Sequence, residues 1–308
     1  MPNDLHYTGG PLDRATILRR DDAWVSTRLA DAGTHVIPVW RNNNLIIGGG
    51  DPEAVMVSGA AARAMIDMAD QIALLGIDGD AAYFAVDLST HDEPALAPHA
   101  GAAEFIDLRQ AGALIERRAG TLLAHARGIM FWHRNNRFCA NCGHPTESHH
   151  GGTIRRCTGP DCGRDHFPRT DPAVIMLVTR PGPDGGACLL ARSAHFLAGM
   201  YSTLAGFVDQ GESLEESVAR EVMEEAGIAV TDVRYQASQP WPFPASLMLG
   251  FRAQATTFAL DFAKDELDDA GWFTRADIAR FGERDMRLPR SDSIARWLVD
   301  SWLNELPE

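Results

Sequence analysis

The residues with the clearest chemical potential lie in the stretch from Gly206 to Ile228, which reads GFVDQGESLEESVAREVMEEAGI. Glu221 and Glu225 are four positions apart. On an α-helix that spacing places them about 40° apart around the axis, so they project from one face. Two carboxylates on one face can hold hard divalent cations such as Mg²⁺. The spacing therefore predicts a cation site on one side of a short helix.

Local signals predict where this helix begins and ends. Ser213 followed by Glu216 forms an S-x-x-E capping box, which predicts a helix start near Leu214. Gly227 is placed to end the helix in a left-handed conformation. The residues from Gly206 to Glu212 are therefore expected to form a loop.

A second stripe of the same helix carries Glu216, Arg220 and Glu224 at four-residue steps, and we interpret it as an ion-paired brace beside the metal-facing stripe. The alternative is an ordinary solvated face, which describes most helices rich in Glu and Arg. However, the pattern G-x5-E-x7-R-E-x-x-E-E-x-G fixes seven positions, and chance matches to such a pattern are rare. We therefore favour the chemical interpretation.

The segment resembles a complete Nudix box, the signature of hydrolases that cut a nucleoside diphosphate linked to another moiety. The match holds at every position of the pattern. The resemblance implies the Nudix fold, a mixed sheet between helices. The box alone does not name the substrate.

Four of the five cysteines cluster within 24 residues, which does not suit a secreted disulfide scaffold. Cys139 and Cys142 form a C-x2-C pair, and after fourteen intervening residues Cys157 and Cys162 form a second pair, with four intervening residues where two are usual. Two such pairs on turns predict a structural site for one Zn²⁺ with four thiolate ligands, closed to catalysis. The alternatives are a reactive thiol or redox pair, a ribbon that binds nucleic acid, or ligation by one of the nearby histidines His144, His149, His150 and His166. Cys188 lies in an apolar run and is expected to be a core residue.

The composition is that of a globular protein. The 308 residues suggest two or three domains, with 45% hydrophobic and 23% charged residues. The net charge of −14 argues against non-specific adhesion to nucleic acid or to anionic membranes. The sequence has no apolar run of signal-peptide or membrane-span length, so we expect a soluble, cytoplasmic protein with no membrane partner.

The order of predicted elements indicates a mixed α/β fold in three domains. We expect an N-terminal domain of strands and a helix at 1–127, a zinc ribbon at 128–168 and a Nudix domain at 169–308. Strands are predicted at 34–40, 44–47, 82–86, 173–179, 188–192 and 246–251, and helices at 112–132 and 291–303.

Beyond the box, the segment Ser238 to Ser246 reads SQPWPFPAS. Its three prolines stiffen the backbone and can hold Trp241 and Phe243 as fixed surfaces for flat heterocycles. The alternative is a proline-rich strand edge or a hydrophobic patch that packs against a partner.

The box, this segment and the four-cysteine ribbon together resemble the NADH pyrophosphatase branch of the Nudix superfamily, over roughly residues 120–300. The resemblance implies cleavage of the pyrophosphate of NAD(H) to nicotinamide mononucleotide and AMP, and removal of NAD caps from RNA 5′ ends. It also implies catalytic Mg²⁺ or Mn²⁺, one structural Zn²⁺ and a homodimer. The N-terminal third shows little resemblance to this branch.

The resemblance also assigns residues. It places two or three catalytic cations on Glu221, Glu225, Glu266 and the backbone carbonyl of Ala205. Glu224 is an alternative candidate for the base that deprotonates water, with Arg220 as its brace. The resemblance implies that Phe207 stacks on the nicotinamide. The other substrate residues that it implies are Phe167, Gln239, Pro240, Trp241, Pro242, Phe243, Pro244, Ala245, Ser246 and Ala295. Phe167 stands where the branch often has Tyr, so a hydroxyl contact is lost.

Two other interpretations compete with an NAD(H) diphosphatase. One is a Nudix hydrolase of another specificity, such as ADP-ribose or coenzyme A, and Trp241 with Phe243 argues against it. The other is a catalytically silent zinc-ribbon binding module or NAD sensor, and the intact set of acidic residues argues against that.

Overall fold

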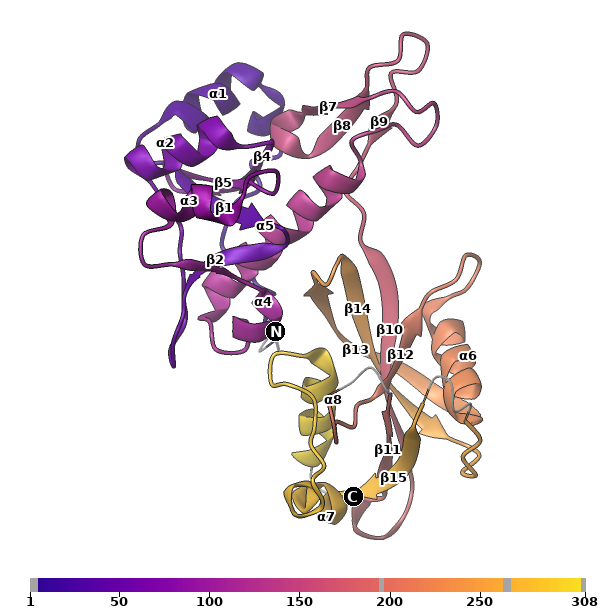
Figure 1. Ribbon diagram of the computed structural model, residues 1–308. Coiled ribbons are helices and arrows are strands. Elements are labelled where there is room, and N and C mark those ends of the chain that lie inside the picture. The colour runs from indigo at the N-terminus through magenta and orange to yellow at the C-terminus, as the bar shows by residue number, and fades with distance from the viewer. Residues whose placement is uncertain (1–4, 194–196, 263–266, 306–308) are drawn as a thin grey trace. The chain divides into compact units, whose positions relative to one another are not determined.

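The computed structural model describes residues 5–193, 197–262 and 267–305 and divides the chain into two compact units (Figure 1). The first unit comprises Met1–Thr170 together with Trp241–Ala245. The second comprises Asp171–Pro240 and Ser246–Glu308. The segment Trp241–Ala245 thus leaves the second unit and returns to it within five residues.

The first unit is built on a mixed sheet with strand order β3-β2-β1-β5-β4, in which β6 also pairs with β2. The strands are β1 His35–Trp40, β2 Asn43–Ile47, β3 Glu53–Ala54, β4 Gln71–Asp78, β5 Ala81–Asp87 and β6 Glu104–Ile106. β1 and β5 are parallel and the other pairs are antiparallel. The strands predicted at 34–40, 44–47 and 82–86 are confirmed, because their β-branched and aromatic residues are buried in this sheet.

The helices of the first unit are α1 Asp22–Ala30, α2 Gly59–Met68, α3 Glu93–Ala100, α4 Leu108–Ala111 and α5 Arg117–Asn135, with a short 3-10 turn η1 at Leu18–Arg20. The predicted helix over 112–132 is α5, and it starts later because Glu116 caps it by accepting from the amides of Arg118 and Ala119. Leu123, Ala126 and Met130 of α5 pack on Ile37 and Ala85 of the sheet. The helix runs through residue 127 without a break.

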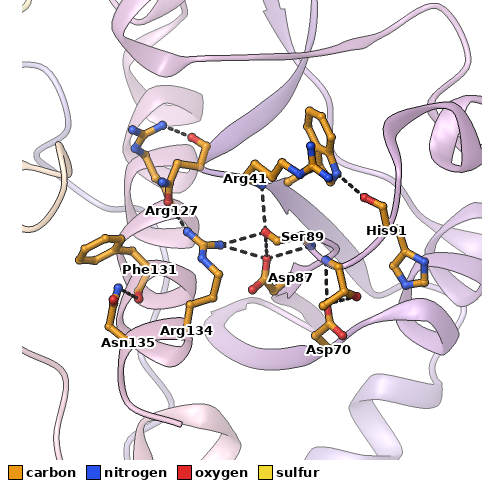
Figure 2. A network of polar contacts seen from close by, with 12 residues as sticks. Arg41, Asp70, Asp87, Ser89, His91, Arg127, Phe131, Arg134 and Asn135 are labelled. Atoms are coloured by element: carbon orange, nitrogen blue, oxygen red, sulfur yellow. Dashed lines mark hydrogen bonds and ion pairs between the residues drawn. The ribbon is translucent and has the colours of Figure 1, made fainter.

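Polar contacts tie the C-terminal half of α5 to the sheet, as Figure 2 shows around Arg134. Arg134 Nη1 donates to the buried carboxylate of Asp87 at 3.0 Å and to Ser89 Oγ at 3.2 Å. About two turns earlier, Arg127 Nε donates to the carbonyl of Pro242 at 2.8 Å. These bonds hold both the C-terminal end of β5 and the Trp241–Ala245 segment against α5.

The ribbon belongs to the same unit and has a three-stranded sheet, β7 Thr146–His149, β8 Ile154–Cys157 and β9 Asp165–His166, with the 3-10 turn η2 at His150–Gly152. His133 of α5 connects the ribbon to that helix. Arg155 Nη1 lies 2.9 Å from His133 Nδ1, and His133 Nε2 lies 2.8 Å from the carbonyl of Gly152. Because arginine can only donate, Nδ1 must accept and Nε2 must carry the proton, so the ring is neutral. Burial accordingly lowers the pKa of His133 to about 4.

This histidine should make stability depend on pH. In the unfolded chain His133 takes up a proton near pH 6.5, whereas in the folded chain it does so only near pH 4. The stability that depends on the neutral ring is therefore present above pH 6.5 and is lost as the pH falls toward 4. His133→Gln keeps a donor and an acceptor but does not titrate. We expect its urea-unfolding free energy to fall less steeply than that of the wild type between pH 6.5 and 4, as measured by circular dichroism. Parallel pH profiles of the two proteins would contradict this role.

The second unit contains a mixed sheet with the order β13-β14-β10-β11-β15, and β12 pairs with β10. The strands are β10 Asp171–Arg180, β11 Ala187–Arg192, β12 Leu204–Phe207, β13 Val230–Trp241, β14 Ser246–Ala255 and β15 Asp269–Thr274. The helices are α6 Leu214–Ala226, α7 Arg275–Ala279 and α8 Ile294–Leu303, with 3-10 turns η3 at Pro183–Gly185 and η4 at Phe281–Arg284. The strands predicted at 173–179, 188–192 and 246–251 and the helix at 291–303 are confirmed. Beyond them lie β12, β13 and β15, which the sequence analysis did not identify. The expectation of a loop from Gly206 to Glu212 is wrong for Gly206 and Phe207, which lie in β12 because they pair with β10.

Two helices cover opposite faces of this sheet (Figure 1). Val174, Met176 and Val178 alternate along β10 and pack on Val218 and Val222 of α6. The other face of β10 and β14 carries α8. The predicted mixed α/β fold, a mixed sheet between helices, is confirmed.

Within the described part of the chain, no helix combines the length and the apolar character needed to cross a membrane.

Candidate active site and zinc ribbon

The local signals place α6 as expected. Ser213 Oγ accepts from the amide of Glu216 at 3.2 Å, and the Glu216 carboxylate accepts from the amide of Ser213 at 2.7 Å. Gly227 ends the helix with φ of 67°. The predicted role of Glu216 in an ion-paired brace is wrong, because its carboxylate is bonded to the backbone at the cap.

Arg220 is the centre of the ion-paired network on α6. Its Nη1 donates to Glu221 Oε1 and to Glu224 Oε2, each at 2.9 Å, so the predicted pairing with Glu224 is confirmed. Its Nη2 donates to Glu212 at 3.0 Å and to the carbonyl of Phe207 at 2.9 Å. The Arg220 guanidinium holds the pKa of Glu212 at about 2, well below its usual range. Glu212, from the loop before the helix, therefore completes the brace in place of Glu216.

Gly206 allows Glu221 to lie against the backbone of β12. A Cβ at position 206 would lie 1.9 Å from Cδ of Glu221 and 2.0 Å from its Oε1. The pairing of β12 with β10, with Val174 opposite Gly206, holds this backbone in place. Burial raises the pKa of Glu221, the guanidinium of Arg220 opposes this, and the negative charge of Glu224 adds to the rise. Such a partly desolvated carboxylate, crowded by like charges, suits a bound cation.

These residues open onto a cleft of about 610 Å³ in the second unit. Its lining includes Ala205, Gly206, Phe207, Asp209, Arg220, Glu221, Glu224, Glu225 and Leu267. The structure therefore brings together the predicted residues Ala205, Phe207, Glu221, Glu224 and Glu225, and the ring of Phe207 is 60% exposed. Glu266 lies outside the described residues. The arrangement offers oxygen ligands for hard cations next to an exposed aromatic ring.

Two predicted substrate residues are Ala295, in the first turn of α8, and Gln239, which lies in β13 and contacts the start of α8. Gln239 Nε2 donates to the carbonyl of Asp292 at 2.7 Å, and the amide of Ile294 donates to Gln239 Oε1 at 2.8 Å. Gln239 and Ala295 are both buried. The contacts of Gln239 position the N-terminus of α8, and contact of either residue with substrate stays a prediction.

The aromatic segment packs in the first unit. The ring of Phe243 is only 8% exposed, lies beneath the guanidinium groups of Arg109 and Arg127 at 5.2 and 4.9 Å, and meets Tyr7 edge-on. For Phe243 the packing alternative therefore describes what is seen, because the ring has almost no open face. Trp241 remains partly exposed, as does Ser246, while Phe167, after β9, is 61% exposed. Contact of these residues with substrate remains a prediction.

The four ribbon cysteines converge. One Sγ atom from each of Cys139, Cys142, Cys157 and Cys162 lies within 4.8 Å of the others, and within the described residues this is the only such group of potential ligands. The Sγ atoms of Cys139 and Cys162 are 3.8 Å apart, and those of Cys142 and Cys157 are 3.3 Å apart. Tetrahedral zinc with bonds of about 2.3 Å requires separations of about 3.8 Å, so the donor set fits a structural zinc ion.

Nearby polar groups contact the ribbon cysteines. The amide of Gly159, inside its loop, donates to Cys157 Sγ at 3.3 Å. Of the histidines considered as ligands, His166 lies with Nε2 3.3 Å from Cys139 Sγ. That position suits a partner of the thiolate. Cys188 is fully buried in the second unit, as predicted.

Comparison with known families finds three matching models. A model of the NUDIX domain matches residues 169–298, and one of the NADH pyrophosphatase zinc ribbon domain matches residues 134–167. A third, the NADH pyrophosphatase-like rudimentary NUDIX domain, matches residues 33–132. The chain belongs to the NADH pyrophosphatase branch of the Nudix superfamily. The expectation of little resemblance in the N-terminal third is therefore wrong, and no catalytic motif there had signalled it.

Similar named proteins include the NAD-capped RNA hydrolase NUDT12 of Homo sapiens, 41% identical over 63% of this chain and 44% of the relative. The NAD-capped RNA hydrolase NudC of Pseudomonas aeruginosa is 44% identical over 59% of this chain and 61% of the relative. NudC of Mycobacterium bovis is 43% identical over 65% of this chain and 66% of the relative. The matched part of this Nudix protein thus spans between about half and two thirds of these relatives.

Proposed function

We propose that the chain hydrolyses the pyrophosphate of NAD(H), adding water across the P–O–P linkage to give nicotinamide mononucleotide and AMP, and that it accepts NAD-capped RNA 5′ ends as well. The observation that carries the proposal is the cleft that joins Glu221, Glu224 and Glu225 to the exposed ring of Phe207. The relatives described as NAD-capped RNA hydrolases support the choice of substrate.

The acidic side of the cleft would hold two or three Mg²⁺ or Mn²⁺ ions through Glu221, Glu225, Glu266 and the carbonyl of Ala205. When bound, these cations neutralise the diphosphate and lower the pKa of a coordinated water. Arg220 orients Glu221 and Glu224 through its two bonds from Nη1 and anchors both to the carbonyl of Phe207. As an alternative, Glu224 would act as the general base that deprotonates the water, held in place by the same guanidinium.

The substrate side of the proposal rests on Phe207. A ring at the end of β12, exposed toward the cleft, can stack on a flat nicotinamide, and such stacking contributes about 1–3 kcal/mol. Phe167, Ala295 and the residues Gln239 to Ser246 would add further contacts.

Outside the cleft, we propose that the four ribbon cysteines bind one structural Zn²⁺. A homodimeric assembly and a cytoplasmic location complete the proposal, both from the resemblance to the branch and the sequence.

The test is a substrate panel with the zinc-loaded chain and Mg²⁺ or Mn²⁺. NAD⁺, NADH, ADP-ribose, coenzyme A and 5′-NAD RNA are each incubated with the protein, and products are separated by chromatography. We expect nicotinamide mononucleotide and AMP from NAD(H), and 5′-monophosphate RNA from the capped RNA. Faster turnover of ADP-ribose or coenzyme A would indicate another Nudix specificity, and no product from any compound would indicate a silent module.

The close approach at Gly206 gives a sharper test of the geometry. In Gly206→Ala the new Cβ must displace the Glu221 carboxylate, and a shift of about 1 Å at a catalytic group can cost about 100-fold in rate. We expect a loss of that order in the turnover of NAD⁺ with little change in melting temperature. The matched control is Gly282→Ala in the same unit, where a Cβ meets no atom within 4 Å and the rate should not change. Equal activity of the two variants would refute the role of Glu221.

A further inference from the structure

Three aromatic rings meet in the first unit, to which the segment Trp241–Ala245 belongs. Trp241 contacts Phe243 edge-on, with ring centres 4.9 Å apart and ring planes at 77°. It contacts Tyr7 in the same way, at 6.1 Å and 67°. The rings of Tyr7 and Phe243 are buried, whereas Trp241 is only partly buried against the core. The indole of Trp241 is therefore held from within the unit while part of it stays exposed.

The backbone of Tyr7 adopts a conformation that is unusual for a large side chain. Its φ of 66° lies in the left-handed region, where a bulky residue is strained. Gly112, which follows α4, leaves room for the phenol, because a Cβ at position 112 would lie 2.1 Å from Tyr7 Oη. A strained and enclosed side chain indicates that the exact position of this ring matters.

Arg127 of α5 fixes the segment that carries Trp241. Its Nε donates to the carbonyl of Pro242 at 2.8 Å, and its guanidinium lies 4.9 Å from the centre of the Phe243 ring. Its Nη1 lies 3.2 Å from Asp107 Oδ1, and this ion pair is largely buried on the arginine side. One side chain thus holds both the backbone and the ring next to Trp241. A buried ion pair adds little net stability, so the value of this one lies in the geometry that it sets.

We propose that Tyr7 and Arg127 are positioning residues for substrate binding, which hold the Trp241 indole ready to stack on a flat heterocycle of the dinucleotide. The face of an indole suits such stacking. A ring that is already restrained loses little conformational entropy when the ligand binds. The inference rests on the proposed function. It assigns a part in substrate binding to residues of the first unit, where the sequence shows no catalytic pattern.

The kinetic test compares Tyr7→Leu with Phe105→Leu in the hydrolysis of NAD⁺ by the full, zinc-loaded chain with Mg²⁺. Phe105, in β6, is buried in a different core cluster of the same unit and contacts Trp40 at 5.8 Å. Each variant therefore removes one ring from a contact with a tryptophan. We expect Tyr7→Leu to raise KM for NAD⁺ about fivefold and to keep kcat within about twofold, because only the restraint on Trp241 is lost.

The control variants separate positioning from packing. Phe105→Leu should lower the melting temperature as Tyr7→Leu does but should leave KM unchanged. Tyr7→Phe keeps the ring and should show the wild-type KM.

Arg127→Met gives an independent comparison if Tyr7→Leu fails to fold. Methionine cannot donate to the carbonyl of Pro242, so the segment loses its hydrogen bond to α5 and KM should again rise about fivefold. Arg118→Met is the matched control, because Arg118 lies on the same helix and forms an exposed ion pair with Asp78. Its KM should equal that of the wild type.

A direct measurement follows the Trp241 ring by ¹⁹F NMR of protein labelled with 5-fluorotryptophan. The chain has seven tryptophans, and the signal of Trp241 is the one that disappears in Trp241→Phe. We expect NAD⁺, added without Mg²⁺ or Mn²⁺, to shift this signal in the wild type. In Tyr7→Leu the same shift should need an NAD⁺ concentration about fivefold higher.

The positioning role is overturned if NAD⁺ leaves the Trp241 signal unchanged. It is also overturned if Tyr7→Leu and Arg127→Met both keep the wild-type KM, or if Phe105→Leu raises KM as much as Tyr7→Leu does. A wild type that does not hydrolyse NAD⁺ contradicts the proposed function. In that case the response of the Trp241 signal to NAD⁺, in the wild type and in Tyr7→Leu, decides the positioning role by itself.

Discussion

Glu225→Gln should lower the rate of NAD⁺ hydrolysis by about three orders of magnitude while the protein stays folded. The amide keeps the shape of the side chain but removes a negative charge from the proposed cation site, and an effect of about 4 kcal/mol on the barrier corresponds to that loss. Glu225 lies one helical turn from Glu221 on the face of α6 that borders the cleft. The measurement is the initial rate at saturating Mg²⁺, together with a thermal melt.

Glu215→Gln is the matched control, because Glu215 is exposed on the same helix and does not line the cleft. It should retain wild-type turnover. Near-wild-type turnover in Glu225→Gln would refute the metal assignment, and an equal loss in both variants would point to a general effect of charge on the helix.

Cys142→Ser should reduce bound zinc to well below one ion per chain and lower the stability of the first unit. Structural zinc contributes on the order of 10 kcal/mol to the folding of small ribbons, since the site does not exist in the unfolded chain. The ribbon is joined to α5 through Arg155 and His133, so its loss should also expose the C-terminal end of that helix. Metal content by atomic absorption and a thermal melt check both effects.

Cys188→Ser is the control that distinguishes the loss of a zinc ligand from the loss of a thiol elsewhere in the chain. Cys188 is fully buried in the second unit and is not a member of the group of ribbon cysteines, so we expect this variant to lose core packing but to keep one zinc ion per chain. An unchanged zinc content and melting temperature in Cys142→Ser would argue against a structural role for the ribbon cysteines.

Much of the site was predictable because it depends on interactions between residues close in the sequence. The limits of α6 follow from a capping box and a left-handed glycine, both set within a few residues of each helix end. The same holds for the cysteine pairs, which lie on short turns. Arg220 and Glu224 meet because four residues make about one helical turn.

Other features were decided by contacts between distant segments. The use of Glu212 in the brace depends on how the loop before α6 folds back on Arg220, and a local stripe pattern favoured Glu216. The strands β12, β13 and β15 were missed because their burial depends on pairing with partners elsewhere in the chain. The N-terminal NUDIX-like region carries no catalytic pattern, so only its overall match to a family model reveals it.

By itself, the sequence determined the chemistry that this chain can offer: carboxylates on one helix face, four thiolates on two turns and aromatic rings among prolines. The tertiary structure decided which of these groups meet. Pairing of β12 with β10 brings Gly206 under Glu221 and leaves Phe207 exposed at the cleft, whereas α5 and Tyr7 cover Phe243 in the first unit. The physical reason is that hydrogen-bonded caps and turns are local, while burial depends on the surfaces that distant segments present to one another.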